Sequence, residues 1–439
     1  MVETRAAVKK AGRRLWRRGV RSVRGARRAA GPRRGLLAYL AVLGPGIIAA
    51  NSGNDASGIA TYSSVGARYG YTLLWTLVPI LFSLGLVQEM CARMGVVTGK
   101  GLADLIRERF GVRWTALVML ALLVANGGVI VSEFVGIAAA TELFGVSRYV
   151  SVPLAAFGIW WIVVKGSYQR VERIFLLMSL VFLGYVASAF MAGPDWGAVG
   201  RELIRPSFSF ERDYLFMLVA LIGTTITPFM QVFVQSSVVD KGATAEDYPL
   251  TRFDVWAGTV FAVVIAFFIV VSTAATLYAT RGPTELESAA EAARALAPVA
   301  GAYAQALFAV GLLGAAMLAV GVLPLATAYS VSEALGFEKG VSRSFREAPI
   351  FLGIFTFLIA AGAFVAMIPG LPVIDVLLTT QFINGLLLPV ILVAVLRLAG
   401  SRELMGAYAN GRLYNAAAWL IVAVVSALSA VLVVKTALG

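Results

Sequence analysis

The feature that most constrains this chain is its series of apolar segments, each long enough to cross a bilayer. A hydrocarbon core of about 30 Å is crossed by a helix of about 20 apolar residues. The chain is 59% hydrophobic and 14% charged, whereas soluble domains are about 45–50% apolar and about a quarter charged. These values predict an all-α polytopic membrane protein. We predict eleven spans, at residues 37–66, 71–92, 114–143, 149–166, 172–192, 214–239, 253–279, 303–335, 349–367, 372–397 and 413–437.

The net charge of +13 is concentrated at the N-terminus. Residues 1–36 hold 13 Arg and Lys residues and one acid, Glu3, so this tail carries +12 of the net charge. We expect a basic cytoplasmic tail that contacts anionic lipid at the bilayer surface. Nucleic-acid binding is not expected, because Trp16 is the only aromatic side chain in the tail on which a base could stack.

The loops show a weaker charge bias of the same sign. With the N-terminus inside, the inner loops hold 16 Arg and Lys residues and the outer loops hold eight. This agrees with the positive-inside rule. An odd number of spans then places the C-terminus outside. We expect a multi-pass protein of the plasma membrane. The Arg-, Ala- and Gly-rich composition of the tail is typical of proteins from GC-rich bacteria.

Two of the spans contain residues that do not fit a plain helix. Span 1 is rich in Gly, Asn and Ser between Gly44 and Gly58 and contains an acid, Asp55. Span 6 contains Pro228, which removes a backbone donor and clashes with the preceding turn. Interruptions at the start of each half are typical of inverted-repeat transporters. We therefore predict one transmembrane domain at 37–439, with halves at 37–196 and 213–398 and an extra helix at 413–437.

Asp55 is the most informative single residue. A carboxylate at the membrane centre costs about 2.5–3.5 kcal/mol on insertion scales, so it persists where a cation, a partner or water compensates it. We predict that Asp55 is a cation ligand. The alternative is an N-cap of the half-helix that follows, and both roles can hold at once. Unwound backbone beside it, at residues such as Ala56, would add carbonyl ligands.

Other oxygen-bearing side chains extend the candidate set. Thr224 and Thr227 offer hydroxyls at the second break, although a threonine in a helix can instead bond its own preceding turn. Gln381 in span 10 is either a ligand or a bridge between helices. Glu133 in span 3 could neutralise a cation, carry a proton or pair with an arginine. Hard oxygen ligands of this kind suit Mg²⁺, Ca²⁺ and Mn²⁺.

No enzyme motif occurs in the sequence. There is no phosphate-binding loop, no nucleophile elbow and no metal-hydrolase histidine pair, and the chain has no histidine. We expect neither enzymatic activity nor a resident cofactor. The transported ion, Mg²⁺ or Mn²⁺, is the only metal ion that we expect the protein to bind. The single cysteine, Cys91, excludes an internal disulfide. Glu89 and Arg93, four positions apart, predict a local ion pair.

Several motifs resemble the Nramp family of divalent-metal transporters. They are the Gly44-Pro-Gly run with Asp55, the segment from Gly66 to Trp75, the segment from Ala92 to Gly99 followed by Leu102-Ala-Asp, Glu133-Phe-Val-Gly, the Thr-Pro pair of span 6, Thr380-Gln381 with Pro389, and the region from Leu404 to Trp419. The resemblance covers nearly the whole chain after residue 36. It implies a LeuT-like inverted repeat of five plus five helices, with broken helices 1 and 6, that carries a divalent metal ion.

The chain departs from this family at two metal-binding positions. Gly58 stands where the family has a metal-binding Asn, and Thr227 stands where it has a Met. A thioether favours softer transition metals, so its loss lowers discrimination against Mg²⁺. The smaller side chains are also expected to vacate volume. A larger and wetter site would suit Mg²⁺, which usually keeps several waters.

The chain also departs at the positions that the family uses to move protons. Phe229 stands at the first histidine of span 6, and Val234 or Gln235 stands at the second. Ile130 replaces an Asp that precedes Glu133 in span 3. None of the three replacements titrates. This pattern resembles the Nramp-related magnesium transporters, a branch that carries Mg²⁺ and Mn²⁺ without proton coupling.

The sequence therefore favours uncoupled uptake of Mg²⁺, and also of Mn²⁺. The alternative is a proton-coupled Mn²⁺/Fe²⁺ transporter in which Asp55 and Glu133 are the only proton carriers. An organic-solute symporter on the same fold is less compatible, because Asp55 would repel a substrate carboxylate. A non-transporting membrane scaffold or receptor would leave the two broken spans unexplained.

Overall fold

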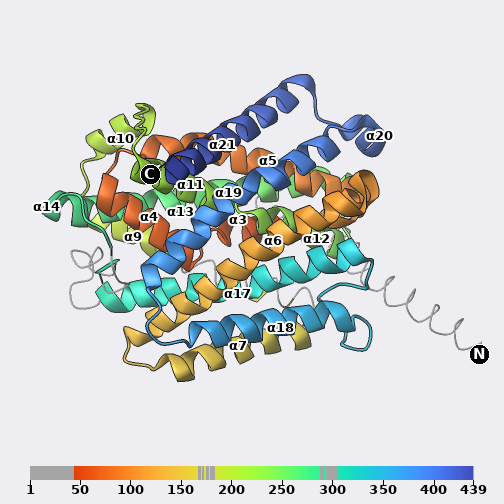
Figure 1. Cartoon of the computed structure of the whole chain (residues 1–439), viewed down its shortest axis with the longest axis horizontal. Helices are drawn as coiled ribbons and strands as arrows, with labels where there is room; N and C mark the ends of the chain where they lie inside the picture. The colour runs from red at the N-terminus through yellow and green to blue at the C-terminus, as the bar shows by residue number, and fades with distance from the viewer. Residues whose placement is uncertain are drawn as a thin grey trace, which may run out of the picture. The chain divides into compact units, whose positions relative to one another are not determined.

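The computed structural model describes residues 44–166, 170, 173, 174, 177, 183–286, 291, 292 and 304–438. The predicted basic tail at 1–36, the beginning of span 1 and part of span 5 lie outside the described residues. Among those described, the regular structure is helical and no strand occurs (Figure 1). Nine helices in this part of the chain are long and apolar enough to cross a membrane, in agreement with the predicted polytopic class.

The helices follow the predicted spans closely. The first half contains α3 (Pro45–Asn51), α4 (Ala56–Tyr69), α5 (Leu77–Thr98), α6 (Leu102–Glu142), α7 (Arg148–Lys165) and α9 (Leu183–Met191). The second half contains α11 (Arg212–Thr225), α12 (Pro228–Asp240), α13 (Tyr248–Thr273), α14 (Ala279–Arg281), α17 (Ala304–Leu335), α18 (Pro349–Ala366) and α19 (Val373–Ala399). Outside the predicted halves lie α10 (Trp196–Ile204), which falls in a segment predicted as a loop, α20 (Arg402–Met405) and α21 (Arg412–Leu438).

Both predicted helix breaks are present. The first separates α3 from α4 and leaves residues 52–55 outside regular helix. The second separates α11 from α12 at Ile226 and Thr227. Thr227 is extended, with φ −70° and ψ 145°, as the residue before a proline prefers. Pro228 occupies the first turn of α12, where its missing N–H would have no partner within the helix.

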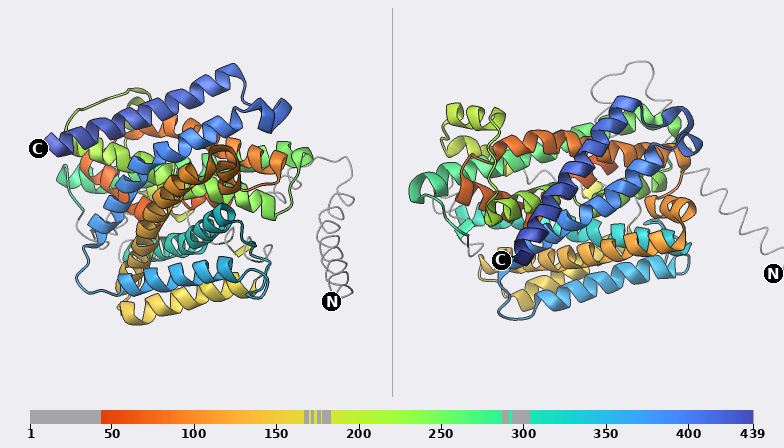
Figure 2. Two further views of the ribbon diagram at one scale, coloured as in Figure 1. Left: turned by 45° about the vertical axis from the view of Figure 1, so that its right-hand side comes forward. Right: turned by 45° about the horizontal axis from the view of Figure 1, so that its top comes forward.

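The broken spans lie at the centre of the helix bundle. α4 contacts α6, α11, α13 and α19, and α12 contacts α3, α5, α6 and α17. Figures 1 and 2 show α7 and α18 side by side at one edge of the bundle. In the segment Arg212–Asp240, all residues of the most apolar 18-residue stretch are buried, whereas 28% of the residues are buried in the corresponding stretches of α7 and α21. The residues at the breaks are therefore surrounded by protein, and α7 and α21 present most of their surface outward.

α6 begins earlier than the sequence predicts. Its first segment, residues 102–110, was expected in an inner loop because of its charges, but it is helical and amphipathic. Arg107 and Glu108 are exposed, while Leu105 is buried. Gly111 then bends the chain with φ 76° and ψ 178°, a backbone conformation that glycine adopts without strain.

The predicted ion pair of α5 is present, with Arg93 Nε 3.2 Å from Glu89 Oε1. Both side chains are buried. Tyr248 and Tyr414 each donate a hydroxyl to the Glu89 carboxylate at 2.5 Å. The pair is therefore more than a local contact, since it joins α5 to the start of α13 and to α21.

Candidate metal site

Asp55 lies immediately before α4 and is fully buried. Its Oδ1 accepts a hydrogen bond of 2.6 Å from the backbone N of Gly58, so it caps α4. Its Oδ2 has no hydrogen-bond partner among the described residues. One oxygen of this carboxylate therefore holds the helix, and the other is available to a cation.

Thr224, just before the second helix break, lies near Asp55. A Cβ built on Gly58 would lie 3.1 Å from Asp55 Oδ1 and 3.2 Å from Thr224 Oγ1, so both oxygens border Gly58. Thr224 and Thr227 are fully buried, and neither hydroxyl has a partner in the described part of the chain. Both threonines thus offer buried oxygens at the break.

The neighbouring Thr225 behaves differently. Its Oγ1 donates to the carbonyl oxygen of Leu221 at 2.8 Å and lies 3.0 Å from the hydroxyl of Tyr62. Bonding of a threonine to its own preceding turn therefore occurs at Thr225 and not at Thr224. Only the tertiary contacts distinguish these adjacent residues of the same type.

Glu133 of α6 also binds the beginning of α4. Its Oε2 accepts from the backbone N of Ala56 at 2.8 Å, and its Oε1 accepts from the backbone N and the hydroxyl of Ser57 at 3.2 and 2.9 Å. A helix N-terminus favours negative charge. These contacts give Glu133 a role that the sequence did not suggest, which is to position the start of α4. Two carboxylates now meet at one helix end, which raises the attraction for a cation.

The expectation of vacated volume at Gly58 is wrong. A Cβ at this position would overlap the carbonyl oxygen of Gly53, so backbone fills the space that a side chain would need. A Cβ at Gly53 would in turn overlap the terminal methyl of Met230. The two glycines allow the non-helical segment before α4 to pack closely against α12.

Met230 lies beside the first break and was not among the candidate residues from the sequence. It is fully buried in α12, three positions after Thr227, and Gln88 Nε2 lies 3.6 Å from its Sδ. A spacing of three places two residues on neighbouring positions of one helix face, and this was the available signal. The structure therefore places a thioether next to the first break, although the thioether expected at position 227 is replaced by a hydroxyl.

Gln381 lies beside the second break. It is fully buried in α19, and a Cβ at Gly223 would overlap its backbone carbonyl, so α11 and α19 touch there. Its Oε1 accepts from Asn384 Nδ2 at 2.9 Å, while its Nε2 has no partner among the described residues. The hydrogen bond is within α19 and does not bridge two helices.

Phe229 and Gln235, two positions at which the family has histidines, lie at different distances from the second helix break. Phe229 is fully buried in the first turn of α12. Gln235 lies eight residues beyond Thr227, about 12 Å along the helix, and its Nε2 donates to the backbone oxygen of Lys100 at 2.9 Å. Gln235 is therefore not brought to the break.

The site combines one available carboxylate oxygen with neutral oxygens. No group of three or more His, Cys, Asp or Glu side chains that could hold a metal ion occurs in the described ranges. A tightly held resident metal would need more charged ligands than Asp55 supplies. The donors are therefore hard oxygens, which suit Mg²⁺, Ca²⁺ and Mn²⁺.

Comparison with known proteins gives consistent relatives. A family model described as Natural resistance-associated macrophage protein-like matches residues 46–435. The divalent metal cation transporter MntH of Ralstonia nicotianae is 29% identical over 413 residues, which cover 87% of this chain and 88% of that protein. The MntH of Yersinia enterocolitica is 28% identical over 416 residues, which cover 92% of this chain and 97% of that protein.

Solved structures show the same fold. A manganese transporter of Eremococcus coleocola superposes with a TM-score of 0.73 at 19% identity, covering 91% of this chain and 87% of that one. Mhp1, a nucleobase-cation-symport-1 family transporter, superposes with a TM-score of 0.56 at 15% identity, covering 89% of this chain and 91% of that one. These likenesses confirm the predicted LeuT-like, all-helical polytopic fold.

Proposed function

Because this chain belongs to the Nramp family, we propose that it carries divalent metal ions across a membrane, with Mn²⁺ as its main cargo. The observation that carries the proposal is the set of buried oxygens at the two breaks. Asp55 Oδ2, Thr224 Oγ1 and Thr227 Oγ1 have no hydrogen-bond partner among the described residues. Oxygen ligands suit Mn²⁺. The names of the MntH relatives and of the solved manganese transporter support a metal cargo, and these relatives are transporters, not enzymes.

Mg²⁺ is the second candidate cargo. Thr227 presents a hard hydroxyl where the family has a thioether, and Mg²⁺ prefers oxygen ligands. The argument from volume does not support Mg²⁺ at Gly58, because the carbonyl of Gly53 fills that space. The similar solved structure is of a manganese transporter, so we rank Mg²⁺ after Mn²⁺ in this proposal.

The proposed mechanism is alternating access around the two breaks. Asp55 supplies the charge, and Thr224, Thr227 and backbone carbonyls complete the ligand set. The half-helices α3, α4, α11 and α12 move against α6, α17 and the helices packed on them. The membrane potential is worth about 2.3 kcal/mol per elementary charge per 100 mV, and roughly twice that for a divalent ion. This is sufficient to drive uptake without another energy source.

We further propose that uptake is not coupled to protons. Phe229 cannot titrate, and Gln235 is bonded to the backbone of Lys100. Glu133 accepts three hydrogen bonds from the start of α4, and these would have to rearrange for it to carry a proton. Coupled Mn²⁺ transport through Asp55 and Glu133 is the competing mechanism.

The test is reconstitution of the full chain in liposomes, with internal dyes that report Mn²⁺, Mg²⁺ and pH. The proposal predicts Mn²⁺ entry that rises with an inside-negative potential and leaves the internal pH unchanged. Asp55→Asn should lower the rate at least tenfold, because it removes the charged ligand but keeps the size of the side chain. Asp195→Asn is the matched control, since Asp195 is an exposed N-cap of α10.

Each outcome decides one part of the proposal. Full-rate transport by Asp55→Asn would reject the site. Entry of Mg²⁺ but not of Mn²⁺ would reverse the order of the two cargoes. Acidification that follows Mn²⁺ entry would establish the coupled mechanism instead.

A further inference from the structure

α12 is fastened to its surroundings at the end that lies away from the helix break. Gln235 Nε2 donates to the backbone oxygen of Lys100 at 2.9 Å. Ser236 Oγ donates to Glu333 Oε1 at 2.7 Å, and Tyr329 donates to Asp240 Oδ2 at 2.7 Å. Three contacts thus join the last two turns of α12 to the α5–α6 connection and to α17.

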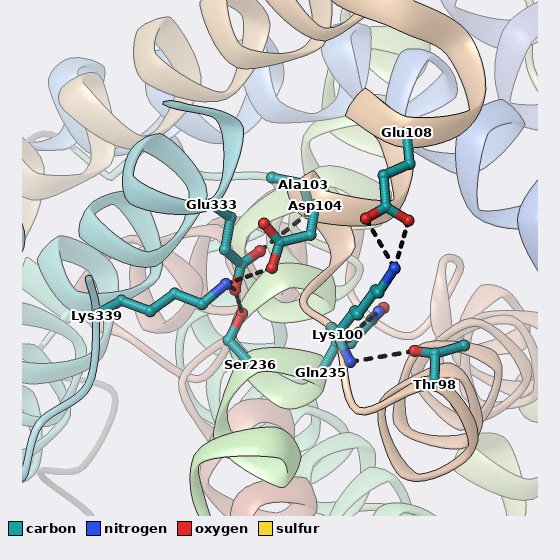
Figure 3. A network of polar contacts seen from close by, with 9 residues as sticks. All are labelled: Thr98, Lys100, Ala103, Asp104, Glu108, Gln235, Ser236, Glu333 and Lys339. Atoms are coloured by element: carbon teal, nitrogen blue, oxygen red, sulfur yellow. Dashed lines mark hydrogen bonds and ion pairs between the residues drawn. The ribbon is translucent and has the colours of Figure 1, made fainter. Parts of the chain in front are cut away.

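Glu333, the acceptor of the bond from Ser236, has further contacts of its own (Figure 3). It lies near the end of α17 and is fully buried, with 1% of its surface exposed. Besides Ser236, its carboxylate accepts from the backbone N of Ala103 at 3.1 Å and pairs with Lys339 Nζ at 3.2 Å. Lys339 also binds Asp104 at 2.5 Å. We call Ser236, Glu333, Lys339, Asp104 and Ala103 the Glu333 cluster.

The Glu333 cluster ties three separate elements to one carboxylate. Ser236 belongs to α12, Ala103 and Asp104 belong to the first turn of α6, and Lys339 follows α17. A Cβ at Gly101 would overlap the Glu333 carboxylate, so the backbone of the α5–α6 connection approaches it directly. A buried carboxylate is costly unless donors surround it. The cluster is therefore stable only while all three elements stay together.

The position of Ser236 links this cluster to the candidate metal site. Thr227 and Ser236 are nine residues apart on one helix, about 13 Å along its axis. α12 is a continuous helix between them, so a movement at one end is transmitted to the other. α12 cannot leave α17 at this end while the bond from Ser236 to Glu333 is intact.

We propose that Glu333 is a positioning residue for transport, which holds α12 against α6 and α17 and must release Ser236 before the ion can leave on this side. The link between this movement and metal transport rests on the proposed function, whereas the contacts of Glu333 do not depend on it. The side concerned is the one on which Lys339 lies, which the charge pattern predicts to be cytoplasmic.

The test measures accessibility of α12 without requiring transport. Cys91 is the only cysteine of the chain, so Cys91→Ala gives a cysteine-free background. Val234→Cys then places a reporter of similar size on α12, at a residue that is fully buried. An impermeant maleimide is applied to each face of membrane vesicles in turn. Ser236→Ala is the test variant, and Glu333→Gln is a second variant that keeps the shape of the side chain.

The matched control is Ser330→Ala. Ser330 is a buried serine of α17 whose hydroxyl donates to the carbonyl of Ala326 in the same helix. Loss of a hydrogen bond to a charged group is expected to change the ratio of closed to open forms about tenfold. Ser236→Ala should therefore be labelled about ten times faster than the parent from the Lys339 side, and Ser330→Ala should match the parent.

Transport provides the readout that a purely structural role would not change. A smaller fraction of outward-facing protein raises the apparent KM for external Mn²⁺ in proportion, so KM should rise several-fold in Ser236→Ala, with a smaller change in kcat. Labelling of both variants at the parental rate would overturn the role of Glu333. Absence of metal uptake by the parent would overturn the proposed function, and the labelling rates would still decide the role of Glu333.

Discussion

At the scale of single residues, the candidate site is built as much by glycines and backbone as by side chains. Gly53 and Gly58 bring the chain before α4 into contact with itself and with Met230. Asp55 and Glu133 divide the donors at the start of α4 between them. We therefore expect that a larger side chain at Gly58 would not restore the site of a related protein, because backbone already occupies that space.

The first residue prediction concerns Gly58. We expect Gly58→Asn to lower Mn²⁺ uptake at least tenfold in liposomes, because its Cβ would overlap the carbonyl of Gly53 and displace the segment that carries Asp55. Gly127→Ala is the control, since no atom lies within 4 Å of a Cβ at that helical glycine. Normal uptake by Gly58→Asn would show that this segment moves aside readily.

The second residue prediction concerns Met230. Met230→Leu conserves volume, which usually costs less than about 1.5 kcal/mol, but removes the thioether that softer metals prefer. We expect competition by Cd²⁺ against Mn²⁺ uptake to weaken several-fold, with little change in competition by Mg²⁺. Met90→Leu is the control, because Met90 is equally buried and its Sδ also contacts an amide, that of Asn410. An unchanged Cd²⁺ inhibition constant would exclude a role for Met230 in selectivity.

At the scale of elements, short half-helices are stabilised by carboxylates from other helices. Asp254 of α13 accepts from the backbone N of Gly44, Gly46 and Ile47 at 2.9, 2.7 and 3.3 Å, so it binds the start of α3. Glu133 does the same for α4. Seven residues are too few to form a stable helix alone. α3 therefore depends on α13 for its position as well as its stability.

The prediction at this scale is that Asp254→Ala destabilises the protein. It leaves three backbone N–H groups without an acceptor, and an unsatisfied buried donor costs about 1–3 kcal/mol. We expect a lower Tm in detergent, measured by the loss of the monodisperse peak after heating. Asp195→Ala removes an exposed cap, which typically costs about 1 kcal/mol, and should have a smaller effect. Equal Tm values for the two variants would contradict the importance of this contact.

At the scale of the whole molecule, the predicted inner loops hold more Arg and Lys residues than the predicted outer loops. The chain is a multi-pass membrane protein with bacterial MntH relatives. Its orientation is a proposal: the N-terminus inside, the C-terminus outside, and the Glu333 cluster on the inner side. This orientation follows from the loop charges and from the number of spans.

The topology prediction uses two exposed positions in the cysteine-free background. Glu338→Cys lies in the predicted inner loop after α17, and Arg205→Cys lies in the predicted outer loop after α10. In intact cells an impermeant maleimide should label Arg205→Cys and should label Glu338→Cys only after the membrane is opened. The opposite result would invert the proposed orientation and place the Glu333 cluster outside.

The sequence by itself determined the membrane class, most span positions and both helix breaks. These features depend on local properties: runs of about 20 apolar residues, Pro228, and a buried acid among glycines. It also singled out Asp55, Thr224 and Thr227 as candidate ligands, and each has a buried side-chain oxygen without a hydrogen-bond partner among the described residues; their role as ligands remains a prediction. The helix that follows the bend at Gly111 begins close to the predicted start of span 3 at residue 114, but the amphipathic helical segment 102–110 before it was not predicted.

Only the tertiary structure decided which of these groups meet. Glu133 binds Ala56 from 77 positions away, and Ser236 binds Glu333 from 97 positions away. The structure also shows that Thr225 contacts Tyr62 whereas the hydroxyl of Thr224 has no partner among the described residues, and that Gly58 borders backbone and not open space. Periodicity and composition describe each helix separately. Packing between distant helices decides which polar atoms meet, because most buried donors and acceptors take their partners from the three-dimensional surroundings.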